Sequence, residues 1–196
     1  MLILFSHLQL SLLQRLGSST RGILPALFTW STIAMAPAIA EPDPVFSPYL
    51  AQIMADAPPA TEVRLPSTVW MGQESQKPST VQVFSSRTLS LLTLGLSTCE
   101  VGVVPCLVGT VTIEPSSTAN GQREYQRHRA GFAPITLATG IKGYFLEGSK
   151  QRPAVPFSSV MWQQNQTFYT LTFPVNDRQN LLFTARDMAN SQPLTP

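Results

Sequence analysis

Six short runs of β-favouring residues, separated by turn-forming residues, follow one another along the chain from Val63 onward. In order they are VWM at 69–71, VQVF at 81–84, LSLLTLGL at 89–96, LVGTVTI at 107–113, ITLA at 135–138 and KGYFLEG at 142–148. Runs of this length at such close intervals are typical of an antiparallel sheet. This pattern constrains the fold more than any other feature of the sequence.

The segment SSVMWQQNQTFYTLTFP predicts a β-hairpin that turns around Gln164-Asn165-Gln166. Apolar residues fall at both even and odd positions of this segment. The two strands can still share one apolar face, because the length of the turn resets which parity points inward.

A helix is predicted directly after this hairpin. Asn176 can cap its first turn, and Gln179 stands three residues later as the capping-box partner. The residues that recur at helical spacing are Leu181, Leu182, Ala185, Met188 and Ala189. We expect this stripe to lie on the sheet.

Residues 41–66 contain six prolines, which resist helix interiors and central strands. We expect this proline-rich segment to lead into the domain without joining its core, apart from a short helix from about Pro48 to Ala55. The predicted fold is α+β: mainly an antiparallel β-sheet, with a short N-terminal helix and a C-terminal helix packed on the sheet. The predicted β-rich domain spans 67–190, and 191–196 form a tail.

Residues 1–40 have the features of a cleavable export signal. Arg15 and Arg21 flank the apolar stretch ILPALFTWSTIAMA, no acidic residue occurs, and small residues stand at Ala38-Ile39-Ala40. Cleavage is predicted between Ala40 and Glu41. The alternative is an uncleaved membrane anchor, although the apolar stretch is shorter than the roughly 20 residues that a membrane span needs. We therefore expect a periplasmic or extracellular protein with no stable membrane span after signal cleavage.

The chain has two cysteines, Cys99 and Cys106, and both lie beyond the leader. In an oxidising compartment a close, even pair predicts a disulfide that closes a short loop. A metal site is disfavoured, because zinc usually takes four Cys or His ligands and the mature chain offers two cysteines and His128. The spacing also differs from the two-residue spacing of redox pairs.

Charge argues against nucleic acid as a partner. Without the leader and its two arginines, 11 of the 13 basic residues remain against 11 acidic residues. A chain of zero formal charge has no general attraction for phosphates. We expect no metal and no cofactor, since no phosphate-binding or dinucleotide-binding glycine motif occurs.

No catalytic signature is present, and we assign no catalytic residue. Any Ser-His or Cys-His mechanism of the mature chain must use His128. Carboxylate pairs such as Glu114 with Glu124 or Glu147 stay formally possible, but nothing in the sequence brings them together.

One local concentration of charge lies in GQREYQRHRAG, between Gly121 and Gly131. If the segment is extended, Tyr125, Arg127 and Arg129 project from one face and form a candidate anion-binding strip. The alternative is a solvated hairpin, which the charge pattern favours.

The ending VMWQQNQTFYTLTFPVNDRQNLLFTARDMA, within about residues 160–189, resembles the hairpin-plus-helix ending of an extracytoplasmic bacterial domain family of unknown function. The shared features map to Trp162, Tyr169 and Ala185. The resemblance implies an envelope-located sensing or binding module.

The sequence therefore predicts an exported, non-catalytic module that binds an envelope protein or an anionic polymer. The alternative is a small hydrolase that acts on envelope or extracellular polymers. A pocket with facing carboxylates, or with His128 beside a hydroxyl, would favour the hydrolase. An uninterrupted surface with an exposed aromatic or basic strip would favour binding.

Overall fold

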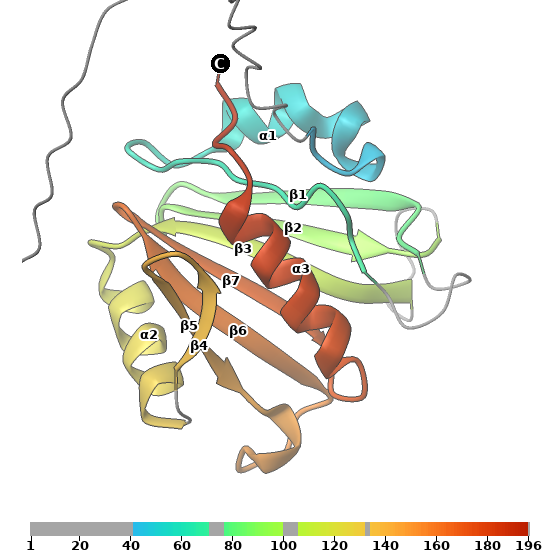
Figure 1. The fold of residues 1–196 in the computed structure, drawn as a ribbon. Helices are drawn as coiled ribbons and strands as arrows, with labels where there is room; N and C mark the ends of the chain where they lie inside the picture. Colours follow the sequence, from blue (N-terminus) through green and yellow to red (C-terminus); the bar gives the residue numbers. More distant parts are fainter. Residues whose placement is uncertain (1–40, 71–76, 100–105, 132–133, 196) are drawn as a thin grey trace, which may run out of the picture. The chain divides into compact units, whose positions relative to one another are not determined.

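A computed structural model of the protein describes residues 41–70, 77–99, 106–131 and 134–195 (Figure 1). The predicted leader and its cleavage point at Ala40 lie outside the described residues. Within them the chain has a mostly antiparallel β architecture with helices, so the predicted α+β class is confirmed.

The strands form one seven-stranded antiparallel sheet with the order β1-β2-β3-β7-β6-β5-β4 (Figure 1). Their bounds are Thr80–Ser86 for β1, Leu91–Ser97 for β2, Leu107–Pro115 for β3, Ile135–Ala138 for β4, Ile141–Leu146 for β5, Phe157–Gln164 for β6 and Thr167–Pro174 for β7. The helical elements are η1 (Pro44–Tyr49), α1 (Leu50–Asp56), α2 (Ala119–Gly131), η4 (Gly148–Lys150) and α3 (Arg178–Asn190).

Five of the six predicted β runs form β1 to β5. The first run, VWM, was also predicted to be a strand, and its two described residues show that this prediction is wrong. Val69 and Trp70 lie outside any strand, and residue 71 lies outside the described residues. Side chains bind their backbone donors: the N–H of Val69 donates to Asp43 Oδ2 at 2.9 Å, and that of Trp70 donates to Thr184 Oγ1 at 3.1 Å. These bonds satisfy the two groups without a neighbouring strand.

The predicted hairpin forms with a two-residue turn at Asn165 and Gln166. Asn165 has φ of 55°, a left-handed conformation that asparagine tolerates better than most residues. This turn pairs Trp162 with Tyr169, so an even residue of β6 shares a face with an odd residue of β7. The two rings stack with centroids 5.3 Å apart, and neither side chain is exposed to solvent. The expected reset of parity is confirmed.

The sheet separates two layers. The apolar stripe of α3 joins Trp162 and Tyr169 in one buried cluster, which defines the core face. Neighbouring strand residues point to opposite faces, so Phe168 faces away from this core and packs against Tyr125 of α2, with ring centroids 4.8 Å apart. Helices α3 and α2 therefore cover opposite faces of the sheet.

The N-terminal segment is part of the core, which corrects the expectation that residues 41–66 only lead into the domain. Phe46 and Ile53 have no exposed surface, and Val63 and Leu65 are also buried. The prolines do exclude this segment from the sheet, but its apolar side chains still cover the core face. The predicted helix from about Pro48 is present as the 3-10 turn η1 continued by α1.

The residues after α3 run beside this N-terminal segment. The N–H of Leu194 donates to the Val63 carbonyl at 2.7 Å, and the buried guanidinium of Arg64 donates to the Ser191 carbonyl. Tyr169 adds a hydrogen bond from its hydroxyl to the Glu62 carbonyl at 2.7 Å, and burial raises the pKa of Tyr169 to about 12.

The C-terminal helix begins one residue later than predicted, with Asp177 rather than Asn176 at the N-cap position. Its predicted stripe is buried at every position except Leu182, which is partly buried against the edge of the core. No helix in the described part of the chain is long and apolar enough to cross a membrane.

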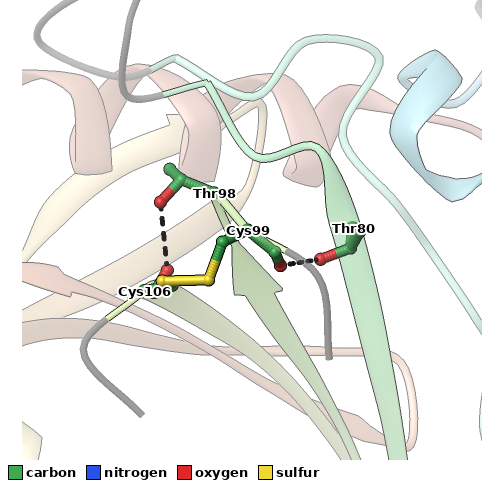
Figure 2. Close-up of a disulfide and its surroundings, with 4 residues drawn as sticks. All are labelled: Thr80, Thr98, Cys99 and Cys106. Atoms are coloured by element: carbon green, nitrogen blue, oxygen red, sulfur yellow. Dashed lines mark hydrogen bonds between the residues drawn. A yellow bond between two sulfur atoms is a disulfide. The ribbon is translucent and has the colours of Figure 1, made fainter. Parts of the chain in front are cut away.

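The predicted disulfide joins Cys99 to Cys106, with Cα atoms 5.7 Å apart (Figure 2). It links the end of β2 to the start of β3, where the N–H of Thr98 also donates to the Cys106 carbonyl at 3.0 Å. The hydroxyl of Thr80 donates to the Cys99 carbonyl at 2.8 Å and fastens β1 to the same point.

Replacement of both cysteines by serine should destabilise the domain by about 2–3 kcal/mol, because the short loop between them gains conformational freedom in the unfolded chain. Urea unfolding of the parent and the double variant measures this difference. Mass analysis without reductant should find the parent two hydrogens lighter than its reduced form. Two free thiols in the freshly purified parent would contradict the pairing.

Candidate functional site

The charged segment between Gly121 and Gly131 is helical, so both the extended strip and the solvated hairpin are wrong as structures. It forms α2, which begins after Thr118. The Thr118 hydroxyl accepts a hydrogen bond from the N–H of Gly121 at 3.1 Å, as an N-cap residue does. The segment has no apolar stripe, because its fully buried residues are Gly121 and His128.

Gly121 lets α2 lie close to the sheet. A Cβ atom at this position would stand 2.8 Å from Phe168 Cδ2 and 2.9 Å from Glu114 Cδ. Both distances are shorter than van der Waals contact, so a larger residue would push the helix away from β3 and β7. This close approach sets the distance between α2 and the strand side chains beneath it.

His128 fastens the next turns of α2 to β6. Its Nδ1 lies 2.8 Å from the Glu124 carbonyl oxygen, which can only accept, so Nδ1 carries the proton. Its Nε2 carries no proton in this tautomer. It therefore accepts a hydrogen bond from the Ser159 hydroxyl, whose Oγ lies 2.8 Å away. Burial lowers the pKa of His128, which keeps the ring neutral near neutral pH.

A cleft of about 370 Å³ opens beside this contact, between one side of α2 and the sheet. Most of its polar lining comes from three kinds of group: sheet hydroxyls, helix side chains and an amide from the segment after η4. The hydroxyls belong to Thr112, Ser159, Thr170 and Thr172, the helix supplies Asn120, Glu124, Arg127 and His128, and the amide is Gln151. Leu91, Leu146 and Phe157 add apolar surface.

The cleft also reaches Glu114, a residue that is only 4% exposed. Burial raises the pKa of this carboxyl, the hydrogen bond from Thr118 Oγ1 at 2.8 Å opposes that rise, and the charge of Glu124 adds to it. Glu114 and Glu124 thus line one cleft, although nothing in the sequence brought them together.

Of the three residues of the predicted anion-binding strip, the structure brings Tyr125 and Arg129 together and places Arg127 elsewhere. Tyr125 packs under α2, with its ring centroid 5.5 Å from that of Tyr144. Arg129 lies over these two rings, 5.8 Å from the Tyr125 centroid. Arg127 turns to the rim of the cleft, where it contacts Glu124 Oε2 at 3.3 Å and donates to Gln151 Oε1 at 3.0 Å. Arg127 therefore does not share a face with Tyr125 and Arg129, and the predicted strip of three residues does not form.

Sequence reasoning missed Ser159 and the threonines of the cleft, because single hydroxyl residues in strands carry no signature of their own. One signal was available for the helix above them. Thr118 is a good N-cap residue, and no proline or β-branched residue interrupts the next 13 positions.

A second hollow, of about 400 Å³, lies beside α1 and the β1–β2 turn. Its charged lining residues are Asp56 and Arg87, and it contains no histidine. Among the residues that the structure describes, no group of three or more His, Cys, Asp or Glu side chains could hold a metal ion. The cleft beside His128 is therefore the stronger candidate for a functional site.

No protein-family model matches this chain, and neither a curated protein nor a solved structure shows significant similarity to it. The resemblance of residues 160–189 to an extracytoplasmic family thus stays a prediction.

His128 should make the domain less stable as the pH falls. Its folded pKa lies below the ordinary value of 6.5, so the unfolded chain binds the proton first, and stability is lost from about that value down through the folded pKa. Glu114 acts on stability in the opposite direction. Because its folded pKa is raised, it lowers the free energy of unfolding as the pH rises. NMR titration should give His128 a lower pKa in the folded protein than in urea.

Glu114→Gln serves as the companion variant, since it removes the opposing carboxyl and keeps its shape. The loss of unfolding free energy between about pH 7.5 and about pH 5.5 should be larger in this variant than in the parent. A folded-state pKa of His128 at or above its value in urea would contradict the assigned burial.

Proposed function

We propose that this protein is an exported, non-catalytic module that binds a small, uncharged ligand bearing hydroxyl or amide groups in the cleft between α2 and the sheet. The observation that carries the proposal is the density of hydrogen-bonding groups on both walls of one concave site. Ligand sites in proteins are typically concave, with a few convergent polar groups that fix orientation.

The charges of the cleft favour an uncharged ligand. Arg127 is already paired with Glu124, and His128 is neutral, so neither offers a free positive charge. Hydroxyls both donate and accept, and the amides of Asn120 and Gln151 do the same. A ligand whose own groups alternate between donors and acceptors matches this lining better than an anion does.

A hydrolase is the second candidate, and the contact between His128 and Ser159 favours it. A neutral imidazole with a free Nε2 beside a hydroxyl is the arrangement by which histidine activates a serine. Acyl transfer also needs donors for the developing oxyanion. Ser159 lies within β6, which is paired with β5 on one side and β7 on the other, so the sheet already uses the nearby backbone donors. Backbone donors that the sheet already uses cannot stabilise an oxyanion, and this places binding first.

The test of the cleft is a screen of neutral polyols, monosaccharides and small amides by thermal shift, with the ring signals of His128 as the NMR reporter. A true ligand should shift those signals. Thr172→Val, which keeps the shape and removes one hydroxyl, should weaken binding about three- to tenfold, the worth of one hydrogen bond. Gln126→Ala on the exposed side of α2 is the matched control and should bind like the parent.

The same preparations decide between binding and hydrolysis. Turnover of p-nitrophenyl acetate by the parent that disappears in Ser159→Ala would establish the hydrolase. If no ligand shifts the His128 signals and no ester is hydrolysed, the cleft is not a functional site.

Export is supported by the acid-free leader and by the disulfide, which persists in oxidising compartments. The exported protein should begin at Glu41 or within a few residues of it, because signal peptidases cut after small residues such as those at Ala38 and Ala40. N-terminal sequencing of the periplasmic or secreted protein measures this. Accumulation of the full-length chain in the cytosol would contradict it.

A further inference from the structure

The face of the sheet that carries the cleft continues over β1, β2 and β3 beyond α2. Phe84 on β1 is 55% exposed on this face, and Leu107 at the start of β3 is 37% exposed. Both side chains flank Gly95, whose missing Cβ would lie 3.3 Å from Phe84 Cε2 and 3.4 Å from Leu107 Cδ1. An exposed aromatic ring therefore lies on the part of the sheet beyond α2, whose main contacts are with β5 and β6.

A row of hydroxyl groups connects this ring to the cleft. The strand register places Phe84 beside Thr93, Thr93 beside Thr112, and Thr112 beside Thr170. The hydroxyls of Thr93 and Thr112 lie 3.3 Å apart, and Thr112 and Thr170 already line the cleft. Three strand spacings separate the ends of the row, which makes it about 14 Å long.

A second row runs parallel to the first. Gly95 is followed by Thr110, Thr172 and Ser159 in register, and the last two line the cleft. None of these six hydroxyl side chains is fully buried. The open face thus presents a regular array of groups that both donate and accept hydrogen bonds.

This array is uncharged. Strands β1, β2 and β7 contain no charged residue, and the single charge of β3 is Glu114, which lies against α2. Such a face has no means of attracting a polyanion, and its many hydroxyls suit a protein partner poorly, since the cores of protein interfaces are mainly apolar. It matches a ligand with many hydroxyls of its own and an apolar ring face that can stack on an aromatic side chain.

We propose that the binding site extends from the cleft along these threonine rows to Phe84, and that its ligand is a neutral saccharide chain. The inference rests on the proposed function, because the cleft forms one end of the extended site. A single sugar ring is too short to reach from the cleft to Phe84, whereas an oligosaccharide spans the row.

Calorimetric titration with neutral oligomers of glucose and of N-acetylglucosamine, from monosaccharide to hexasaccharide, tests the extension. Affinity for one of these series should rise with chain length until the row is filled, and added salt should not weaken it. Phe84→Ala should reduce the affinity for the long chains about tenfold, because the stacking contact is lost, and leave the monosaccharide unaffected.

Two further variants make the result specific. Thr93→Val, which keeps the side-chain shape, should also weaken only the long chains. Phe183→Ala removes an aromatic ring of similar exposure, 42%, from α3 and should change nothing. Circular dichroism confirms that each variant is folded before titration.

The outcomes separate the two proposals. Monosaccharide binding without any gain from length, or an unchanged affinity in Phe84→Ala, would overturn the extended site and leave the cleft as a small-ligand site. Binding of no saccharide in either series would likewise overturn the inference. The proposal that the cleft binds small ligands is tested separately: it is overturned if no small ligand shifts the His128 signals.

Discussion

The register between β6 and β7 is the constraint on which both faces of the protein depend. The two-residue turn at Asn165 pairs even residues of β6 with odd residues of β7. Trp162 and Tyr169 therefore meet in the core, while Ser159 and Thr172 meet on the opposite face. A slip by one residue in either strand would place aromatic rings in the cleft and hydroxyls in the core. One turn thus positions the main core contact and the main hydroxyl pair of the site.

Helix α2 converts part of that second face into a concave site. It has little apolar surface, and it is held by Gly121 near Phe168, by the ring of Tyr125 and by the hydrogen bonds of His128. Because these contacts lie along one line of the helix, the neighbouring side chains at Glu124 and Arg127 remain at the opening. The result is a polar wall held at a fixed distance above a row of strand hydroxyls.

The sheet and its hairpin could be predicted because each strand carries its own local pattern of β-favouring residues and turns. Helix α2 could not be found in this way, because a helix that docks through one glycine, one tyrosine and one histidine shows no apolar period. The burial of the N-terminal segment was also not predicted, because its prolines indicate a segment outside the core. Its prolines rule out a strand, yet Phe46 and Ile53 are as deeply buried as any strand residue.

The cleft depends on pairings between residues far apart in the sequence, so it was largely hidden from sequence analysis. Ser159 contacts His128 only because β6 lies under α2, and Thr112 meets Thr170 only through the β3–β7 pairing. The disulfide, in contrast, could be predicted from the sequence, because its two cysteines lie only seven positions apart. The N–H of Asp43 donates to the Pro66 carbonyl at 2.8 Å, and the N–H of Leu194 donates to the Val63 carbonyl, so both ends of the described domain lie beside residues 63–66. A linker between these two ends, with new termini in the exposed β1–β2 turn, would therefore give a circular permutant that retains every strand pairing and the whole cleft.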